Sequence, residues 1–220
     1  MPLETERLIL REMTTDDFDA LYEIFSDPET MRHYPKPFDR EKTQGWIRWN
    51  LENYAQYGYG LWAVTLKETG RVIGDCGITM QKIHGEMKPE IGYHIHKDCQ
   101  RKGYATEAVR ACRDFFFTHT DFDAVYSYMK YTNAGSYGTA IKNGMHLIEE
   151  YEDPVNTVTK VYGITRDEWE NMKKYWEAAR GTRRENIAKD FFRKEPLVGS
   201  FLLQKQVAQR LLECYNRRSK

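Results

Sequence analysis

A single stretch near the middle of the chain, residues 90–108, constrains the fold more than any other. Residues 90–96 have the pattern of a strand, and residues 100–105 form a short polar loop that contains glycine. Residues 105–119 then carry apolar side chains at helical spacing. The stretch therefore predicts a strand that leads through a tight loop into a helix, which places the chain among mixed α and β folds.

This loop has the physical parts of a phosphate-binding site. The first N–H groups of a helix point outward and carry partial positive charge, so a phosphate can bind them directly. Gly103 lets the backbone approach a ligand without a Cβ in the way, and Arg101 and Lys102 add positive charge nearby. An ordinary connection with solvated basic residues is the alternative, because short glycine motifs are common by chance.

The remaining pattern predicts an α+β fold with a central, mostly antiparallel sheet flanked by helices. Strands are expected at 3–11, 61–66, 72–80, 90–96, 124–129, 147–151 and 158–164, and helices at 14–25, 39–57, 105–119 and 136–143. From residue 166 onward the pattern is helical. We therefore expect a main domain over residues 1–165 and a helical C-terminal extension over residues 166–220.

The expected extension is basic, whereas the main domain is acidic. Residues 165–220 hold 14 Lys and Arg against 8 Asp and Glu, a net +6, and residues 1–164 hold 19 against 25, a net −6. We interpret the basic segment as a solvated helix surface, with nucleic-acid binding as the lesser alternative. An apolar stripe within it fits packing on the chain's own main domain or a homodimer contact. The stripe consists of Leu202, Leu203, Val207, Leu211 and Leu212.

Cysteine usage and hydropathy favour a cytoplasmic protein. Without a C-x-x-C pair or a secretion signal, scattered cysteines are expected to be reduced thiols. No segment approaches the roughly 18 apolar residues that cross a bilayer, so no membrane partner is expected. The spacing of His94, His96 and Cys99 is interpreted as two strand histidines on one face and an incidental thiol, not as a metal site. The cysteines are Cys76, Cys99, Cys112 and Cys214.

Three short motifs stand in order along residues 3–165: TERLILR at 5–11, QRKGYATEA at 100–108, and NAGS followed by KNGM within 133–145. The second motif resembles the acetyl-CoA signature of the GNAT acetyltransferase superfamily, and the third resembles a later segment of the same family. The first resembles the start of the branch that contains the ribosomal-protein N-terminal alanine acetyltransferases. Independent motifs in the right order are far more specific than either alone.

The resemblance implies that acetyl-CoA is the cofactor, as acetyl donor, and no metal is expected. Members of the family hold the pantetheine arm like an added strand beside the strand that here ends at His94, Ile95 and His96. Asn133 would hydrogen-bond that arm, and Lys142 would lie near the nucleotide end unless it is a solvated helix residue. Loop residues would bind the pyrophosphate through backbone groups or added charge: Arg101, Lys102, Gly103, Tyr104, Ala105 and Thr106.

The implied reaction moves an acetyl group to an amine, and it first requires a base that frees the lone pair of that amine. Glu90 is the first candidate, because it lies on the strand just before the loop and can act through a water. His94 and Asp75 are the second and third candidates. Structural interpretations stand beside these: Glu90 as an exposed strand-end carboxylate, and His94 as a partly buried structural residue.

The reaction also requires a proton for the departing thiolate. Many GNAT enzymes place a tyrosine seven residues after the asparagine of the third motif, but that position is Ala140 here. We therefore expect a different acid. Ser136 occupies the place that the N-terminal acetyltransferase branch uses, and it would also cap the short helix. Tyr137 is the alternative donor.

The acceptor is expected to be a primary amine, with a protein N-terminus as the first hypothesis. An α-amine has a pKa of about 7.7–8.0 and a lysine amine about 10.4, so one base of modest strength suits the α-amine better. The alternatives are a small amine such as an aminoglycoside or polyamine, and a catalytically idle acetyl-CoA-binding or scaffold protein. Tyr34 and Trp46, with Asp75 on a neighbouring strand, are expected to line the acceptor side.

Overall fold

The computed structural model describes residues 2–181 of the 220-residue chain. The chain divides into two compact units, Met1–Arg166 and Asp167–Lys220. After the first unit the structure describes the helix α5, Arg166–Gly181, as the sequence pattern predicts. The apolar stripe within residues 202–212 lies outside the described residues. The division into an acetyltransferase domain and a separate extension stays a prediction.

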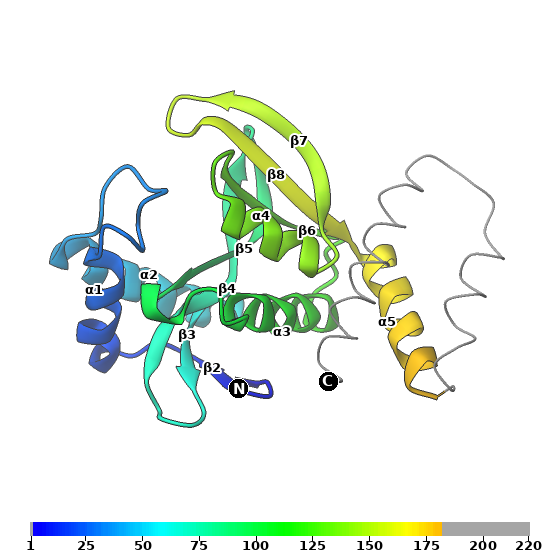
Figure 1. Cartoon of the computed structure of the whole chain (residues 1–220), viewed down its shortest axis with the longest axis horizontal. Helices are drawn as coiled ribbons and strands as arrows, with labels where there is room; N and C mark the ends of the chain where they lie inside the picture. The colour runs from blue at the N-terminus through cyan, green and yellow to red at the C-terminus, as the bar shows by residue number, and fades with distance from the viewer. Residues whose placement is uncertain (1, 182–220) are drawn as a thin grey trace. The chain divides into compact units, whose positions relative to one another are not determined.

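An eight-stranded sheet forms the centre of the first unit, in the order β1-β2-β3-β4-β5-β6-β8-β7 (Figure 1). Every neighbouring pair is antiparallel except β5 and β6, which are parallel. This confirms the predicted α+β class with a mostly antiparallel sheet. The strands are β1 Leu3–Glu4, β2 Leu8–Arg11, β3 Leu61–Leu66, β4 Val72–Ile83, β5 Glu86–Ile95, β6 Ala124–Lys130, β7 His146–Asp153 and β8 Thr157–Thr165.

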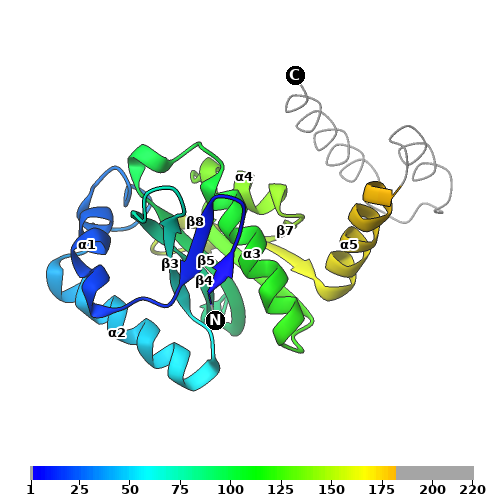
Figure 2. The same ribbon diagram turned by 90° about the horizontal axis from the view of Figure 1, so that it is seen from below.

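Helices cover both faces of the sheet, with α1 and α2 on one side and α3 and α4 on the other (Figure 2). Local caps fix the ends of α2: Asp39 accepts a hydrogen bond from the N–H of Lys42, and Gly58 ends the helix in the left-handed region with a φ of 75°. The helices are α1 Phe18–Ser26, α2 Arg40–Tyr57, α3 Tyr104–His119 and α4 Ala134–Lys142, with short 3-10 turns η1 Thr15–Asp17 and η2 Lys97–Cys99.

The N-terminal segment, expected as one strand over residues 3–11, forms two short strands instead. The strands β1 and β2 pair with each other, because Thr5 closes the turn between them. Its N–H donates to the carbonyl of Leu8 at 3.0 Å, and its hydroxyl accepts the N–H of Leu8 at 2.9 Å. A side-chain hydrogen bond of this kind competes with continued extended backbone.

The strands β4 and β5 extend beyond their predicted ranges and form one long hairpin. A turn at His84 and Gly85, with φ values of 47° and 88°, joins them and matches the twist of the flanking strands. The segment 81–89 is largely polar, so its strand character is not evident from the sequence pattern alone.

Apolar side chains pack on both faces of the central strands. On the face covered by α1 and α2, the buried cluster includes Leu21, Ile24, Phe25 and Ile47. On the opposite face, the sulfur atoms of Cys76 and Cys112 lie 3.5 Å apart at hydrogen-bond distance, and both thiols are free rather than joined in a disulfide. Fully burying one large apolar side chain contributes roughly 1.5–3 kcal/mol, so both layers hold β4 and β5 in place.

Candidate active site

The parallel strands β5 and β6 separate soon after they meet. Their register has one paired position, Glu90 with Tyr126, whereas β4 pairs with β5 as far as Ile95. Beyond Glu90, within the part of the chain that the structure describes, the edge of β5 on the β6 side has no strand partner. An extended ligand with its own hydrogen-bonding groups can pair with such an edge.

The direction of the amide groups shows which residues face this free edge. The backbone N–H of His94 donates to Asp75 Oδ1 at 2.9 Å. That of His96 donates to the carbonyl of Ile73 in β4 at 2.8 Å, so both N–H groups face β4. Amide groups of successive strand residues point to opposite edges, so those of Tyr93 and Ile95 face the free edge. Sequence reasoning missed Tyr93, which strand alternation could have indicated.

The loop after β5 leads into a helix start with unoccupied amides. Gln100 Nε2 donates to the carbonyl of Ile95 at 3.0 Å, which holds the loop against the strand end. Gly103 is the N-cap of α3, with a φ of 85° and no side-chain cap, and Arg101 also has a positive φ, of 60°. Among residues 2–181, no hydrogen bond occupies the N–H groups of residues 103–106. These groups are therefore available to an anionic ligand.

The basic residues predicted near the cofactor are exposed. Arg101 and Lys102 lie in the loop before α3, and Lys142 lies in the last turn of α4, at the end away from Asn133. Their side chains form no hydrogen bond or ion pair with any described residue. All three side chains are thus free to adjust to a ligand, and only the first two lie beside the start of α3.

A polar contact from the N-terminal turn holds the first turn of α3. Glu107 Oε1 accepts the Thr5 hydroxyl at 2.6 Å and the N–H of Arg7 at 2.8 Å, and its Oε2 accepts Arg7 Nε at 2.7 Å. Arg7 also donates to the carbonyl of Lys102 at 3.0 Å, and its guanidinium covers the ring of Tyr104 at 4.5 Å. We call the three side chains of Thr5, Arg7 and Glu107 the N-terminal brace.

The charge of the N-terminal brace complements the helix start. Burial raises the pKa of Glu107, but the hydrogen bonds from Thr5 and Arg7 outweigh it and keep that pKa below its usual range. A carboxylate in the first turn is also favoured by the helix dipole. Sequence reasoning missed the brace, although both of its ends lie inside the motifs at 5–11 and 100–108, because nothing local pairs residues so far apart.

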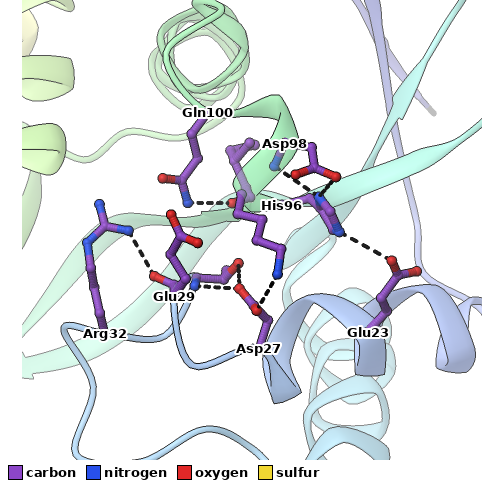
Figure 3. A network of polar contacts seen from close by, with 10 residues as sticks. Glu23, Asp27, Glu29, Arg32, His96, Asp98 and Gln100 are labelled. Carbon is purple, nitrogen blue, oxygen red and sulfur yellow. Dashed lines mark hydrogen bonds and ion pairs between the residues drawn. The ribbon is translucent and has the colours of Figure 1, made fainter.

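A second polar network holds the loop from the side of α1 (Figure 3). His96 Nε2 lies 3.3 Å from Glu23 Oε1, and His96 Nδ1 accepts the backbone N–H of Asp98 at 3.2 Å. Lys97 forms an ion pair with Asp27 at 2.8 Å, and this bond lowers the pKa of Asp27 well below its usual range. The side chain of His96 therefore anchors η2 to α1.

On the sheet face covered by α1 and α2, one buried carboxylate collects three N–H donors. Asp75 is fully buried on β4. Its Oδ1 accepts both the backbone N–H of His94 at 2.9 Å and the ring Nδ1 at 2.8 Å, and its Oδ2 accepts Trp46 Nε1 at 2.9 Å. The structure thus brings together Trp46 and Asp75, both predicted on the acceptor side, with His94, predicted beside the cofactor.

Glu90 lies on the same face of β5 as His94 and is half-buried rather than fully exposed. A Cβ built on Gly92 would lie 3.1 Å from Glu90 Oε2, so the carboxylate leans along the strand over that glycine. Burial, followed by the charge of Asp75, raises the pKa of Glu90 to about 8. Tyr34 packs its ring 5.1 Å from that of His94, and burial and the charge of Glu90 raise its pKa. The Glu90 carboxyl, with its raised pKa, can therefore take and return a proton near neutral pH.

The start of α4 presents the other predicted residues. Asn133 is the N-cap, and its Oδ1 accepts the N–H of Ser136 at 3.1 Å. The helix therefore begins before the predicted position, and Asn133 takes the capping role expected of Ser136. The hydroxyl of Tyr93 donates to Ser136 Oγ at 3.4 Å. Tyr137 instead stacks against Tyr162 of β8, with ring centroids 6.2 Å apart.

The histidines of the HxHxxC spacing occupy separate environments. The ring of His94 contacts Asp75, whereas that of His96 contacts Glu23. Among residues 2–181, no three His, Cys, Asp or Glu side chains gather as metal ligands. In the same range, no helix has the length and apolar character that crossing a membrane requires.

Comparison with known proteins identifies the class of this chain. The family model for the acetyltransferase (GNAT) domain matches residues 7–146. The protein YkkB of Bacillus subtilis (strain 168) is 36% identical over 157 residues, which cover 70% of this chain and 91% of YkkB. The chain is an acyltransferase, and it belongs to the GNAT acetyltransferase family.

Solved structures share the same fold. The crystal structure of an acetyltransferase from Agrobacterium tumefaciens C58 has a TM-score of 0.65 and 29% identity, covering 74% of this chain and 94% of that one. The ribosomal L7/L12 α-N-protein acetyltransferase RimL, in complex with coenzyme A, has a TM-score of 0.63 and 15% identity, covering 75% of this chain and 98% of RimL. The second comparison shows the fold alone.

Proposed function

We propose that this enzyme transfers the acetyl group of acetyl-CoA to a primary amine by direct attack in a ternary complex. The observation that carries this function is the free edge of β5, which runs into the unoccupied amides at the start of α3. In this assignment, the amide groups of Tyr93 and Ile95 hold the pantetheine arm. The N–H groups of residues 103–106 hold the pyrophosphate. The fold is also that of RimL, which was solved with coenzyme A, and this supports the same donor.

Three further residues are proposed to bind the donor. Asn133 uses its Oδ1 as the helix cap, which leaves its Nδ2 for the pantetheine arm. Arg101 and Lys102 add positive charge beside the phosphates. Lys142 lies at the far end of α4 and is assigned to the nucleotide end only.

Glu90 is the proposed base for the amine. Its half-buried carboxyl lies on the face of β5 that carries the acceptor-side residues, and its pKa of about 8 suits proton transfer near neutral pH. For the departing thiolate we assign Ser136 as proton donor, because the Tyr93 hydroxyl donates to its Oγ. The stacking of Tyr137 on β8 favours Ser136 over Tyr137 for this role.

The acceptor is proposed to approach from the face of the sheet covered by α1 and α2. Tyr34, Trp46 and Asp75 gather there beside Glu90, which supports the predicted acceptor side. A protein N-terminus remains the first candidate, and a small amine such as an aminoglycoside or polyamine remains the second. We further propose a cytoplasmic location without a membrane partner, which fits the free thiols of Cys76 and Cys112.

A thiol-release assay tests the function. The full chain is mixed with acetyl-CoA and a panel of N-terminal peptides, aminoglycosides and polyamines, and free coenzyme A and acetylated product are measured together. We expect thiol release only when acetyl-CoA and an accepted amine are both present, with acetylation on nitrogen. Failure to bind acetyl-CoA, or binding without thiol release for every amine, would contradict the proposed function.

A further inference from the structure

The side chain of His94 has one nitrogen that no described residue uses. The side chain is 5% exposed, and its Nδ1 lies 2.8 Å from Asp75 Oδ1. Its Nε2 is buried and has no hydrogen-bond partner among residues 2–181. Because the Asp75 carboxylate already accepts two other N–H donors, we assign the ring proton to Nδ1. Nε2 therefore holds a free lone pair, and an unpartnered buried polar atom requires an explanation.

The surroundings of the His94 ring favour a positively charged group. The centroids of four aromatic rings lie 5.0 to 6.3 Å from that of His94. Aromatic ring faces attract cations, the Asp75 carboxylate contacts the histidine from β4, and Glu90 lies four residues earlier on the same face of β5. The four rings belong to Phe25, Tyr34, Trp46 and Phe38.

Glu90 approaches the same place along β5. Alternate residues of a strand share a face, so the side chains of Glu90 and His94 lie on the same side, with Gly92 between them. Because Gly92 has no side chain, it does not separate the two groups, and the Glu90 carboxylate leans over it. The other titratable groups that influence Glu90 or the ring of Tyr34 here are Asp75 of β4, Tyr93 of β5 and Tyr128 of β6.

Proton counting gives the two groups different roles. A primary ammonium has three N–H bonds and its amide product has one, so two protons leave the nitrogen, and a single base on Glu90 accounts for one of them. We propose that His94 is a second catalytic residue, whose Nε2 takes the first proton from the acceptor. The acceptor is then a primary alkylamine that is charged at neutral pH. This assignment rests on the acetyl transfer proposed above.

One N–H bond of the ammonium breaks, its electron pair stays on nitrogen, and the proton bonds to His94 Nε2, while Asp75 stabilises the resulting imidazolium through Nδ1. The freed pair forms a C–N bond with the carbonyl carbon of the thioester while the C=O π pair moves onto oxygen, and nitrogen then loses its second proton to Glu90. As the oxygen pair re-forms the carbonyl, the C–S bond breaks, and sulfur leaves with the bonding pair and takes the hydroxyl proton of Ser136. Ser136 regains a proton from the Tyr93 hydroxyl, which donates to its Oγ, and Tyr93 is re-protonated from solvent. The net change is one proton moved from nitrogen to sulfur and one released to solvent.

The test is a series of primary alkylamines of matched size whose basicity is lowered stepwise by fluorine. In His94→Gln the amide cannot take a proton, so kcat/KM should fall about 100-fold for amines that are charged at the assay pH, as is typical of a lost general base. For amines that are already uncharged at that pH, the fall should be less than about 3-fold, because the first proton is absent. A purely structural role for His94 would lower both to the same extent.

Two further variants separate a chemical role of His94 from a loss of folding. His94→Asn keeps a donor near the position of Nδ1 for Asp75 and lacks Nε2, so it should show the same selective loss, with thermal unfolding measured for both variants. His119→Gln, an exposed histidine at the other end of α3, should leave all rates unchanged. A uniform loss across the amine series, or no loss, would overturn the role of His94. Absence of thiol release by the wild type with every amine would instead contradict the proposed function.

Discussion

The two sides of β5 are built from different parts. Toward β6 and α3, the candidate donor site consists chiefly of backbone groups: amides of the free strand edge and of residues 103–106. On the α1 and α2 face, the candidate acceptor site consists of side chains, chiefly Glu90, His94 and Asp75. A backbone site depends on conformation and is insensitive to most side chains, whereas a side-chain site depends on individual atoms. Substitutions should therefore affect donor binding through shape, and turnover through chemistry.

The largest effect is expected from Gly103→Glu, which alters only the candidate donor site. Gly103 has a φ of 85°, and a Cβ there would lie 3.3 Å from Arg7 Nη2. The new side chain adds strain, bulk and negative charge where a diphosphate is proposed to bind. We expect acetyl-CoA affinity to fall by more than about 100-fold, roughly 2.7 kcal/mol or more, as measured by calorimetry.

Gly70→Glu is the matched control for that variant. Gly70 also has a positive φ, of 71°, and a Cβ there would meet nothing within 4 Å. It should suffer the same backbone strain and gain the same charge, yet keep its affinity for acetyl-CoA. Equal affinity in a folded Gly103→Glu variant would remove the loop from the donor site.

The next largest effect is expected from Glu90→Gln, which alters only the candidate acceptor site. Removal of a general base typically costs about 100- to 1,000-fold in kcat, whereas acetyl-CoA affinity should not change. Since the pKa of Glu90 is raised to about 8, its basic form grows above that pH, and wild-type kcat/KM should rise through this region. The rise should be absent in Glu90→Gln. Glu86→Gln, at the exposed start of β5, is the matched control.

The same pKa shift has a consequence for stability. The folded state favours the protonated form of Glu90, so this contribution is fully present below the usual pKa of 4.5 and is lost as pH rises through about 8. Urea unfolding of the wild type should therefore show a loss of stability between these values that Glu90→Gln lacks. Parallel curves for the two proteins would show that Glu90 titrates as it does in water.

The smallest effect is expected from Ser136→Ala, which tests the boundary between the two sides. Ser136 accepts from Tyr93, but Asn133 caps α4, so the helix should remain stable without the serine hydroxyl. We expect turnover to fall about 10-fold, with little change in acetyl-CoA affinity, because only protonation of the thiolate is impaired. Turnover equal to that of the Ser26→Ala control would remove Ser136 from the mechanism.

The strand, loop and helix that form the candidate donor side could be predicted from sequence because they are local. A strand, Gly103 and a helix follow one another within a few residues, so spacing alone indicates their geometry. The limits of this prediction are also local: the resemblance implies that His94 and His96 lie beside the pantetheine arm, yet their N–H groups face β4. The amide of Tyr93, one residue before His94, faces the free edge of β5 instead. The direction of strand amides depends on the partner strand, which the sequence does not name.

The acceptor side could be predicted only as separate residues. Trp46, Asp75 and His94 were each named, but their shared hydrogen bonds depend on β4 pairing Asp75 opposite His94 and on α2 crossing that face. Ion pairing and register between distant segments leave no periodic signal in one sequence. For the same reason the split of the first predicted strand at Thr5 could not be seen, since one hydroxyl decides it.

The N-terminal brace has a consequence for how the enzyme is made. Arg7 and Glu107 are separated by 100 residues, and contacts of such long sequence separation form late because a large loop must close first. During translation, the glycine loop must emerge from the ribosome before Arg7 has its partner. In nascent chains that end before Glu107, Arg7 cannot hold the first turn of α3. The capacity to bind the proposed cofactor should therefore arise in one step, after α3 is synthesised.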